Sequence, residues 1–241
     1  MNTKIIGILG GMGPEATLDL YAKIIRATPA AKDQDHLRVI IDSNPQIPDR
    51  TPAIIADGEN PVPTMLASGK MLESAGVDFI VIPCISAHFF LNELQQGLKV
   101  PILSAFDAVA EKISKEFSDV KTIGLISTTG TIQGGKFAQR LLQNSIAAVV
   151  PDENDQKAVM DAIYHIKGTQ QPDVRRQCQA DLIRVSQNVI KMGAQGIIAG
   201  CTEIPLELKA EDLPVPYFNP LQILAETAVR KAQAAKQAST E

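Results

Sequence analysis

The sequence is poor in cysteine, and it has no long apolar run. Its three cysteines, Cys84, Cys178 and Cys201, are an odd number without C-x-x-C spacing, which argues against a disulfide framework and a structural zinc site. No apolar stretch approaches the roughly 20 residues of a membrane span. The apolar run at residues 5–9 is short and soon followed by acidic residues, so we expect no signal peptide.

A cluster of basic residues with interleaved aromatics is also missing. The chain has 23 Lys and Arg against 27 Asp and Glu, a net charge of −4, and this balance argues against a nucleic-acid partner. We therefore expect a cytoplasmic protein that binds neither membrane nor nucleic acid. The length of 241 residues and the 45% hydrophobic content fit one large α/β domain or two small ones with real cores.

An internal repeat favours two domains. The segment 76–84, which ends in Cys84, resembles the segment 193–201, which ends in Cys201 and lies 117 positions later. The same offset separates the apolar runs around Gly7 and Gly124. The chain therefore reads as two related halves, each with one thiol at the end of an apolar strand. Two thiols facing each other across a pseudo-twofold axis suit a reaction that removes a proton from one face of a carbon and returns one to the other.

Short runs of Val and Ile alternate with longer amphipathic stretches, a pattern typical of βα units and parallel sheets. In the first half we predict strands near 4–9, 37–42, 78–83 and 100–103, and helices near 15–27, 63–75 and 86–96. In the second half we predict strands near 121–126, 146–150, 195–199 and 215–218, and helices near 131–143, 153–167 and 173–192.

Two further helices suggest how the halves connect. A helix near 105–117 leads into the second half, and one near 220–237 can fold back on the first. We therefore expect one domain from 1–103 plus 215–241 and another from 104–214. The Pro-rich segment 44–63 has no clear periodicity, and long loops of this kind are often lids or binding loops.

The candidate functional residues follow the strands, where ligands of open parallel sheets bind. Taken alone, a free cysteine is commonly an inert buried residue. However, Cys84 and Cys201 occupy matching positions, and each is followed within two residues by a hydroxyl, Ser86 or Thr202, that could cap a helix. A helix N-terminus lowers the pKa of a thiol and offers N–H donors to an anion. Cys178 lies in an amphipathic helix, and we interpret it as a packing residue.

Several motifs leave two interpretations open. Residues 11–16 formally match G-x-G-x-x-A, with Asp42 placed as a ribose-binding acid, which would indicate a dinucleotide site. Pro14 removes an N–H from that turn, and a turn shaped for a small carboxylate explains the glycines equally well. His88 is either a hydrogen-bonding group near the site or a buried core histidine.

Two cations have similar alternatives. Arg50 either lies in a solvated turn or binds an anionic substrate. Lys167 complements a helix dipole by default.

Six motifs together resemble the aspartate/glutamate racemases that work without pyridoxal phosphate, over nearly the whole chain. They are GILGGMGPEAT at 7–17, IPDRT at 47–51, Pro83-Cys84 with Ala87-His88, Gly130-Thr131, Ile166-Lys167, and GCTEIP at 200–205. The resemblance implies two similar flavodoxin-like α/β domains related by pseudo-twofold symmetry, with the active site in the cleft between them. It also implies a homodimer that interconverts L- and D-aspartate or glutamate and needs neither cofactor nor metal.

The resemblance assigns roles to eight residues. Cys84 and Cys201 would be the catalytic acid/base pair. The substrate-binding residues would be Thr128 and Thr202 at the α-carboxylate, Arg50 and Lys167 at the side-chain carboxylate, and also Met12 and Ser86.

One position departs from the family pattern. Ile85 stands where the family has an asparagine that donates to the substrate carboxylate, although Ser86 can replace the threonine hydroxyl that follows it. Losing one such donor costs about 2.7–4 kcal/mol of transition-state stabilisation. We therefore expect slow turnover of aspartate, or a more apolar amino acid as the substrate.

Other functions stay open. The chain could be another enzyme of the superfamily: a broad-specificity amino-acid racemase, a hydantoin racemase, or a maleate isomerase in which one cysteine adds to a double bond. It could also be a non-catalytic protein that binds an amino acid or carboxylate, or a dehydrogenase that binds a dinucleotide at the Gly-rich turn.

Overall fold

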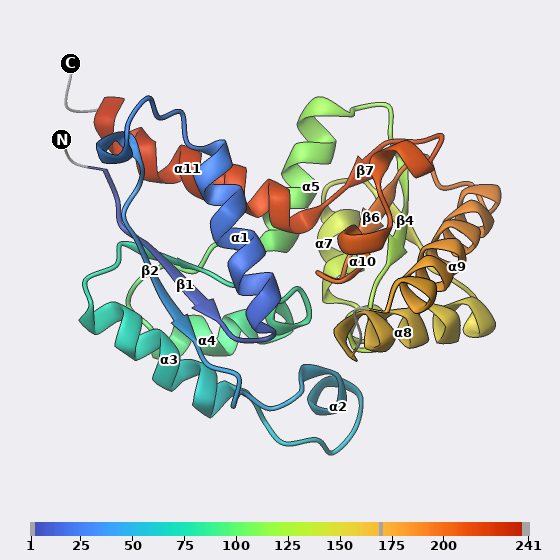
Figure 1. The fold of residues 1–241 in the computed structure, drawn as a ribbon, viewed down its shortest axis with the longest axis horizontal. Coiled ribbons are helices and arrows are strands. Elements are labelled where there is room, and N and C mark those ends of the chain that lie inside the picture. Colours follow the sequence, from blue (N-terminus) through green and yellow to red (C-terminus); the bar gives the residue numbers. More distant parts are fainter. Residues whose placement is uncertain (1–2, 169–170, 238–241) are drawn as a thin grey trace.

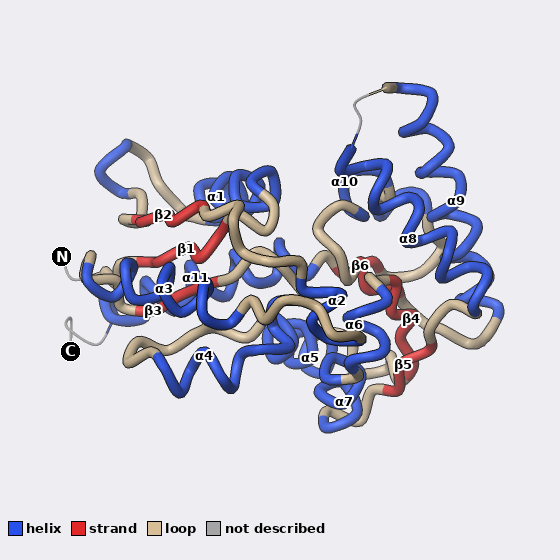
Figure 2. The backbone as a smooth tube through the Cα atoms, turned by 90° about the horizontal axis from the view of Figure 1, so that it is seen from below, coloured by secondary structure: helices blue, strands red, loops and turns tan. Residues whose placement is uncertain are grey.

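The computed structural model describes residues 3–168 and 171–237, which form two parallel sheets. The first sheet has the strand order β2-β1-β3, with β1 at Ile6–Gly10, β2 at Val39–Ser43 and β3 at Phe79–Val81. Figure 2 shows its strands apart from those of the second sheet.

The second sheet has the order β5-β4-β6-β7. Its strands are β4 at Thr122–Ile126, β5 at Ala147–Val149, β6 at Ile197–Ala199 and β7 at Tyr217–Phe218.

The strand register confirms the internal repeat. Gly7 pairs with Ile80 in the first sheet, and Gly124 pairs with Ile197, each 117 positions later, in the second. An isolated parallel bridge between Ile80 and Ile102 occupies the position that β7 holds beside β6. The predicted strand at 100–103 is therefore only a bridge among the described residues.

Helices cover both sheets (Figure 1). The α-helices are α1 Pro14–Ala27, α2 Arg50–Ile55, α3 Val62–Ser74, α4 Leu91–Gly97, α5 Ala105–Glu116, α6 Thr129–Gly134, α7 Lys136–Gln143, α8 Glu153–Gly168, α9 Pro172–Lys191, α10 Ile204–Glu207 and α11 Pro220–Gln237. Short 3-10 helices lie at Asp33–Asp35, Ser86–Phe90 and Ala210–Asp212.

The last helix folds back on the first half, as predicted. Helix α11 packs against α1 and α5, and Figure 1 shows it beside α1. The N–H of Lys4 donates to the carbonyl of Ala232 at 3.1 Å, so the segment before β1 lies beside α11. One apolar cluster includes side chains from β1, β4 and α11. This shared core joins the two halves.

The expected domain limits at 103 and 215 stay a prediction. Strand β7 follows residue 215 but pairs with β6 in the second sheet, whereas α11 packs against α1 of the first half. Residues 1–2 and 238–241 of the expected first domain lie outside the described residues.

Three further predictions about local structure differ from what is observed. The Pro-rich segment 44–63 contains a helix, α2, which packs against α6 of the other half. The predicted helix at 131–143 is two helices, because Gly135 between them adopts a left-handed φ of 68° that glycine tolerates best. The predicted helix at 86–96 begins as a 3-10 turn and continues as α4.

Among the residues that the structure describes, none of the helices combines the length and apolar character needed to cross a membrane.

Candidate active site at the junction of the two halves

Both cysteines line one small cavity between the halves. Cys84 follows β3 and Cys201 follows β6, and the two residues are 6% and 7% exposed. The cavity measures about 20 Å³. All eight predicted site residues line it: Met12, Arg50, Cys84, Ser86, Thr128, Lys167, Cys201 and Thr202. The structure thus brings the predicted residues together, while their roles remain predictions.

Two hydrogen bonds join the end of β6, which positions Cys201, to the end of β4. Ser127 donates its hydroxyl to the carbonyl of Gly200 at 2.5 Å, and the N–H of Gly200 donates to the carbonyl of Ile126 at 2.7 Å. A side chain at position 200 would collide with Ser127, since its Cβ would lie 2.8 Å from the Ser127 side chain. Glycine before Cys201 therefore permits the close approach that fixes the thiol.

Glu203 is the nearest partner of the second thiol. The Cys201 Sγ donates to Oε2 of Glu203 at 2.9 Å, and the Thr202 hydroxyl donates to the same oxygen at 3.1 Å. Burial raises the pKa of the Cys201 thiol well above its ordinary value, the Glu203 carboxylate raises it further, and Lys167 opposes the rise.

Two expectations about Cys201 are therefore wrong. Its pKa is raised rather than lowered, because burial and the Glu203 carboxylate disfavour the thiolate. Thr202 does not cap the following helix either; α10 begins after Glu203 without a side-chain cap, and the hydroxyl of Thr202 bonds Glu203 instead.

The first thiol has a different neighbour. The Cys84 Sγ lies 3.3 Å from the hydroxyl oxygen of Ser86. Ser86 does not cap a helix as predicted, because the 3-10 helix already begins at Ser86 and Ile85 occupies the cap position without a side-chain bond. Ile85 is 3% exposed and packs into the apolar core, so it offers the cavity no polar group.

Two cations complete the cavity wall. Arg50 begins α2, and its Nη1 donates to the carbonyls of Ile47 and Pro48 at 3.1 and 2.6 Å. Its Nε is buried without a hydrogen-bond partner, and the residue lines the cavity.

Lys167 approaches from α8 and lies 3.8 Å from Oε1 of Glu203. Its partial burial lowers the pKa of the ammonium group, but Glu203, Cys201 and Cys84 outweigh this effect and raise that pKa. Lys167 thus carries a stable positive charge beside both thiols.

Thr128 and Met12 line the cavity from the ends of the first strands of each half. The Thr128 Oγ1 accepts a hydrogen bond from the N–H of Thr131 at 3.2 Å and so caps α6. Met12 is 4% exposed and lies next to Gly11, whose φ is 92°. A Cβ on Gly11 would lie 2.3 Å from the backbone of Asn44. Chain packing therefore accounts for this glycine without a dinucleotide.

His88 is a buried residue that does not line the cavity of the two cysteines. Its Nε2 lies 3.0 Å from the carbonyl of Ile82, and its Nδ1 accepts from the N–H of Ala105 at 3.3 Å. Burial lowers the pKa of His88 to about 4, although the bond to Ile82 opposes this. The imidazole is therefore neutral and holds the end of β3 against the start of α5.

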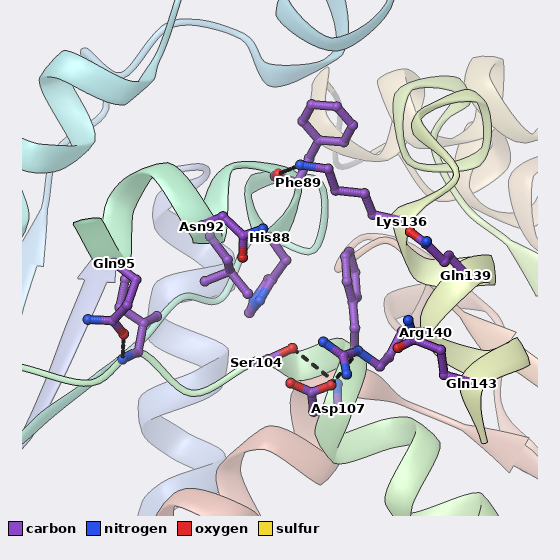
Figure 3. Close-up of a pocket in the computed structure, with 13 residues that line it drawn as sticks. His88, Phe89, Asn92, Gln95, Ser104, Asp107, Lys136, Gln139, Arg140 and Gln143 are labelled. Carbon is purple, nitrogen blue, oxygen red and sulfur yellow. Dashed lines mark hydrogen bonds and ion pairs between the residues drawn. The ribbon is translucent and has the colours of Figure 1, made fainter. Parts of the chain in front are cut away.

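A second, larger cavity of about 300 Å³ is bordered by His88 and lies between α4, α5 and α7 (Figure 3). Neither Cys84 nor Cys201 lines this cavity. Lys136 of α7 donates to the carbonyl of Phe89 at 2.6 Å, and Arg140 pairs with Asp107 at 2.6 Å. The contact between Lys136 and Phe89 joins the halves on this side, and the pair of Arg140 and Asp107 joins α7 to α5.

Several residues of the small cavity were not predicted from the sequence: Asp49, Thr51, Met160, Ile163, Tyr164, Gly200 and Glu203. Met160, Ile163 and Tyr164 share a face of α8 with Lys167, because residues three and four apart on a helix are neighbours. The spacing from Lys167 could have indicated them. Glu203 could have been noticed as a carboxylate two residues after a thiol.

This fold, with two similar α/β halves, is the fold of solved racemases. Aspartate racemase of Picrophilus torridus matches with a TM-score of 0.83 at 31% identity, over 95% of this chain and 94% of that one. An aspartate racemase homologue from Pyrococcus horikoshii OT3 matches with a TM-score of 0.78 at 25% identity, over 95% and 99% of the two chains. The protein is therefore an isomerase of the racemase class.

Sequence comparison gives the family. The sequence model of the Asp/Glu/hydantoin racemase family matches residues 9–228, and the chain belongs to this family. It is also 31% identical, over 93% of its length and 96% of the relative's, to the broad specificity amino-acid racemase RacX of Bacillus subtilis (strain 168).

Proposed function

We propose that this protein interconverts L- and D-aspartate or glutamate by proton transfer between Cys84 and Cys201, without a cofactor. The observation that carries the proposal is the shared cavity, which both thiols line together with the cations Arg50 and Lys167. A thiol has an ordinary pKa of about 8.5, close enough to neutral pH for both its forms to take part in acid–base catalysis.

The reaction uses one thiol as base and the other as acid. One thiolate removes the Cα proton, and the opposite thiol delivers its proton to the other face, which inverts the centre. Negative charge then builds on the α-carboxylate, which we assign to the hydroxyls of Ser86, Thr128 and Thr202. The Thr202 hydroxyl donates to Glu203 in this structure and would turn to the substrate when it binds. Electrostatic stabilisation of such developing charge is a large contribution to catalysis.

The side-chain carboxylate of the substrate is assigned to Arg50 and Lys167. The free Nε of Arg50 supports this assignment, since arginine suits a planar carboxylate. A cavity of about 20 Å³ has room for about one water molecule, so an amino acid requires the cavity to open. Helix α2 carries Arg50 and packs on α6 of the other half, and movement of this contact would widen the cavity.

Isotope exchange tests the proposal. Incubation with either enantiomer of aspartate or glutamate in D2O should place deuterium at Cα of the inverted product, as measured by mass spectrometry and chiral chromatography. A double variant, Cys84→Ala with Cys201→Ala, should show neither inversion nor exchange. Retained activity in that variant would refute the two-thiol mechanism.

A broader substrate range is the second candidate. Ile85 presents an apolar, buried side chain where a donor to the carboxylate would be useful, and the relative RacX is named for broad specificity. The same D2O assay across both enantiomers of many amino acids decides between the candidates. Faster exchange with apolar amino acids than with aspartate would favour the broad-specificity racemase.

The proposal includes a homodimer, as the family resemblance implies, and a location in the cytoplasm, as the composition of the sequence indicates. Sedimentation equilibrium at several protein concentrations should give twice the chain mass of 25.9 kDa. Cell fractionation tests the location.

A further inference from the structure

The proposed reaction gives Glu203 no role, although this residue contacts Cys201, Thr202 and Lys167. Its carboxylate is 8% exposed and accepts hydrogen bonds from the Cys201 thiol and the Thr202 hydroxyl on one oxygen. Its other oxygen faces the Lys167 ammonium at 3.8 Å. A buried carboxylate is expensive unless it is paired and hydrogen-bonded, and these contacts provide both. Glu203 is thus held in place, directly against one of the two thiols.

The contact favours one protonation state of Cys201. An ionised carboxylate only accepts hydrogen bonds, so the proton in the 2.9 Å contact belongs to the thiol. If Cys201 lost this proton, two negative charges would face each other in a buried site. Like charges disfavour ionisation, and the raised pKa of Cys201 agrees with this.

The first thiol has no such carboxylate in the corresponding place. Ser86 lies 117 positions before Glu203, and its hydroxyl oxygen is 3.3 Å from the Cys84 sulfur. A hydroxyl can donate a hydrogen bond to a thiolate, which a carboxylate cannot do. The repeat therefore puts a group that tolerates a thiolate beside one sulfur and a group that opposes it beside the other.

Other charged or titratable groups face the same cavity. They are Asp49 and Arg50 at α2, Tyr164 and Lys167 on α8, and the two thiols themselves. Lys167 interacts with both thiols, so its charge does not by itself separate them. Glu203 is the group whose hydrogen bond goes to one thiol.

We propose that Glu203 is a positioning residue that keeps Cys201 protonated in the free enzyme, so that Cys84 is the base and Cys201 the acid when a turnover begins. This inference rests on the proposed function. In the forward turnover the Cys84 thiolate takes the Cα proton while the Cys201 S–H bond breaks and a new Cα–H bond forms. Cys84 ends as a thiol and Cys201 as a thiolate. Proton exchange with water then restores the starting state, with no net gain or loss of protons.

The asymmetry has a particular kinetic signature. Two enantiomers have equal free energies, so kcat/KM must be the same in both directions and cannot report it. The alkaline limb of the pH profile can report the asymmetry, because activity falls when Cys201, the thiol that acts as acid, loses its proton. Glu203→Gln removes the like charge, so Cys201 should lose its proton at lower pH. We expect this limb to move down by about one to two pH units.

NMR of the enzyme carrying cysteine labelled with 13C at Cβ tests the coupling directly. The signals are assigned with single Cys→Ser variants, and the pH at which each changes is measured. In the unaltered enzyme Cys201 should titrate above the ordinary range of a thiol. In Glu203→Gln the Cys201 midpoint should fall by about one to two units, while Glu203→Asp, which keeps the charge on a shorter side chain, should give a smaller fall.

Glu207→Gln is the matched control. Glu207 is also a partly buried glutamate, but it pairs with Arg175 at 2.5 Å and acts on Cys178. This variant should leave the Cys201 midpoint unchanged.

An unchanged Cys201 midpoint in Glu203→Gln, or an equal shift in Glu207→Gln, would overturn the inference. The titration does not depend on turnover. Absence of deuterium exchange in the unaltered enzyme would refute the proposed function and leave the measured coupling standing, so the two failures are distinguishable.

Discussion

The two cysteines follow equivalent strands, but the residues after them differ in chemical character. Cys84 is followed by Ile85 and Ser86, whereas Cys201 is followed by Thr202 and Glu203. The first pair gives one apolar side chain and one neutral hydroxyl, and the second gives one hydroxyl and one carboxylate. The backbone repeat therefore preserves the place of each thiol, while two adjacent positions in each half set its electrostatic surroundings.

The largest expected effect comes from removing one thiol at a time. Cys84→Ala and Cys201→Ala should each lower the rate of inversion by about 10²–10⁴-fold, the usual contribution of a positioned acid or base. Because each remaining thiol lies on one face of Cα, the two variants should retain Cα–H exchange with opposite enantiomers. Deuterium incorporation into separately supplied enantiomers measures this.

Cys178→Ala provides the control, since Cys178 packs in the core of the second half. It should keep the inversion rate. Exchange of the same enantiomer by both catalytic-thiol variants would contradict the assignment of the thiols to opposite faces.

The next effect concerns His88, for which the second half has Pro205 at the equivalent position. The native pKa of His88 is about 4 against an ordinary 6.5, so between these values the unfolded chain binds more protons. The neutral, buried His88 therefore contributes roughly 3 kcal/mol to the free energy of unfolding above pH 6.5. This contribution is lost as the pH falls from 6.5 to about 4. His88→Gln should flatten the pH dependence of the unfolding free energy in this window.

Urea unfolding at several pH values measures that slope. His165→Gln, which alters an exposed histidine of α8, should leave it unchanged. An equally steep slope in His88→Gln would show that another group is responsible for it.

A smaller effect is expected at Ile85, whose counterpart is Thr202. Ile85→Asn should raise kcat/KM for aspartate relative to an apolar amino acid by about tenfold, which is part of the effect of one oxyanion donor. It should also lower the melting temperature, because Ile85 is 3% exposed in the core and burying an amide costs free energy. The ratio of kcat/KM values is the measurement, because a loss of folded enzyme affects both substrates equally. An unchanged ratio would show that this position does not select the substrate.

The smallest effect concerns the contact between α2 of the first half and α6 of the second. A Cβ on Gly130 would lie 3.0 Å from the Cα of Thr51, so Gly130→Ala must displace α2 and Arg50 slightly. We expect KM for aspartate to rise by a few fold, since small misplacements weaken binding and catalysis.

Gly168→Ala is the control, because a Cβ there meets no atom within 4 Å. Steady-state kinetics of both variants gives the comparison. Equal KM values would show that this packing does not position Arg50.

Much of the fold could be predicted from the sequence, because strand and helix periodicity are local properties. The pairing of Gly7 with Ile80 and of Gly124 with Ile197 reproduces the offset of 117 positions. The helix at α2 was missed, since its six residues, one of which is Pro52, are too few to show a period. Helix caps at Ser86 and Thr202 were wrongly expected, because the turn after each cysteine starts at a different residue than the pattern suggested.

The sequence by itself determined the two-part α/β fold and the position of one thiol at the end of a strand in each half. Only the tertiary structure decided that Arg50 and Lys167 reach the same cavity, that His88 turns into the core, and that Glu203 bonds Cys201. Periodicity indicates which face of an element is buried, but not which side chains from distant elements meet. That depends on how the two halves pack together, and the surroundings of each thiol therefore became visible only in the folded chain.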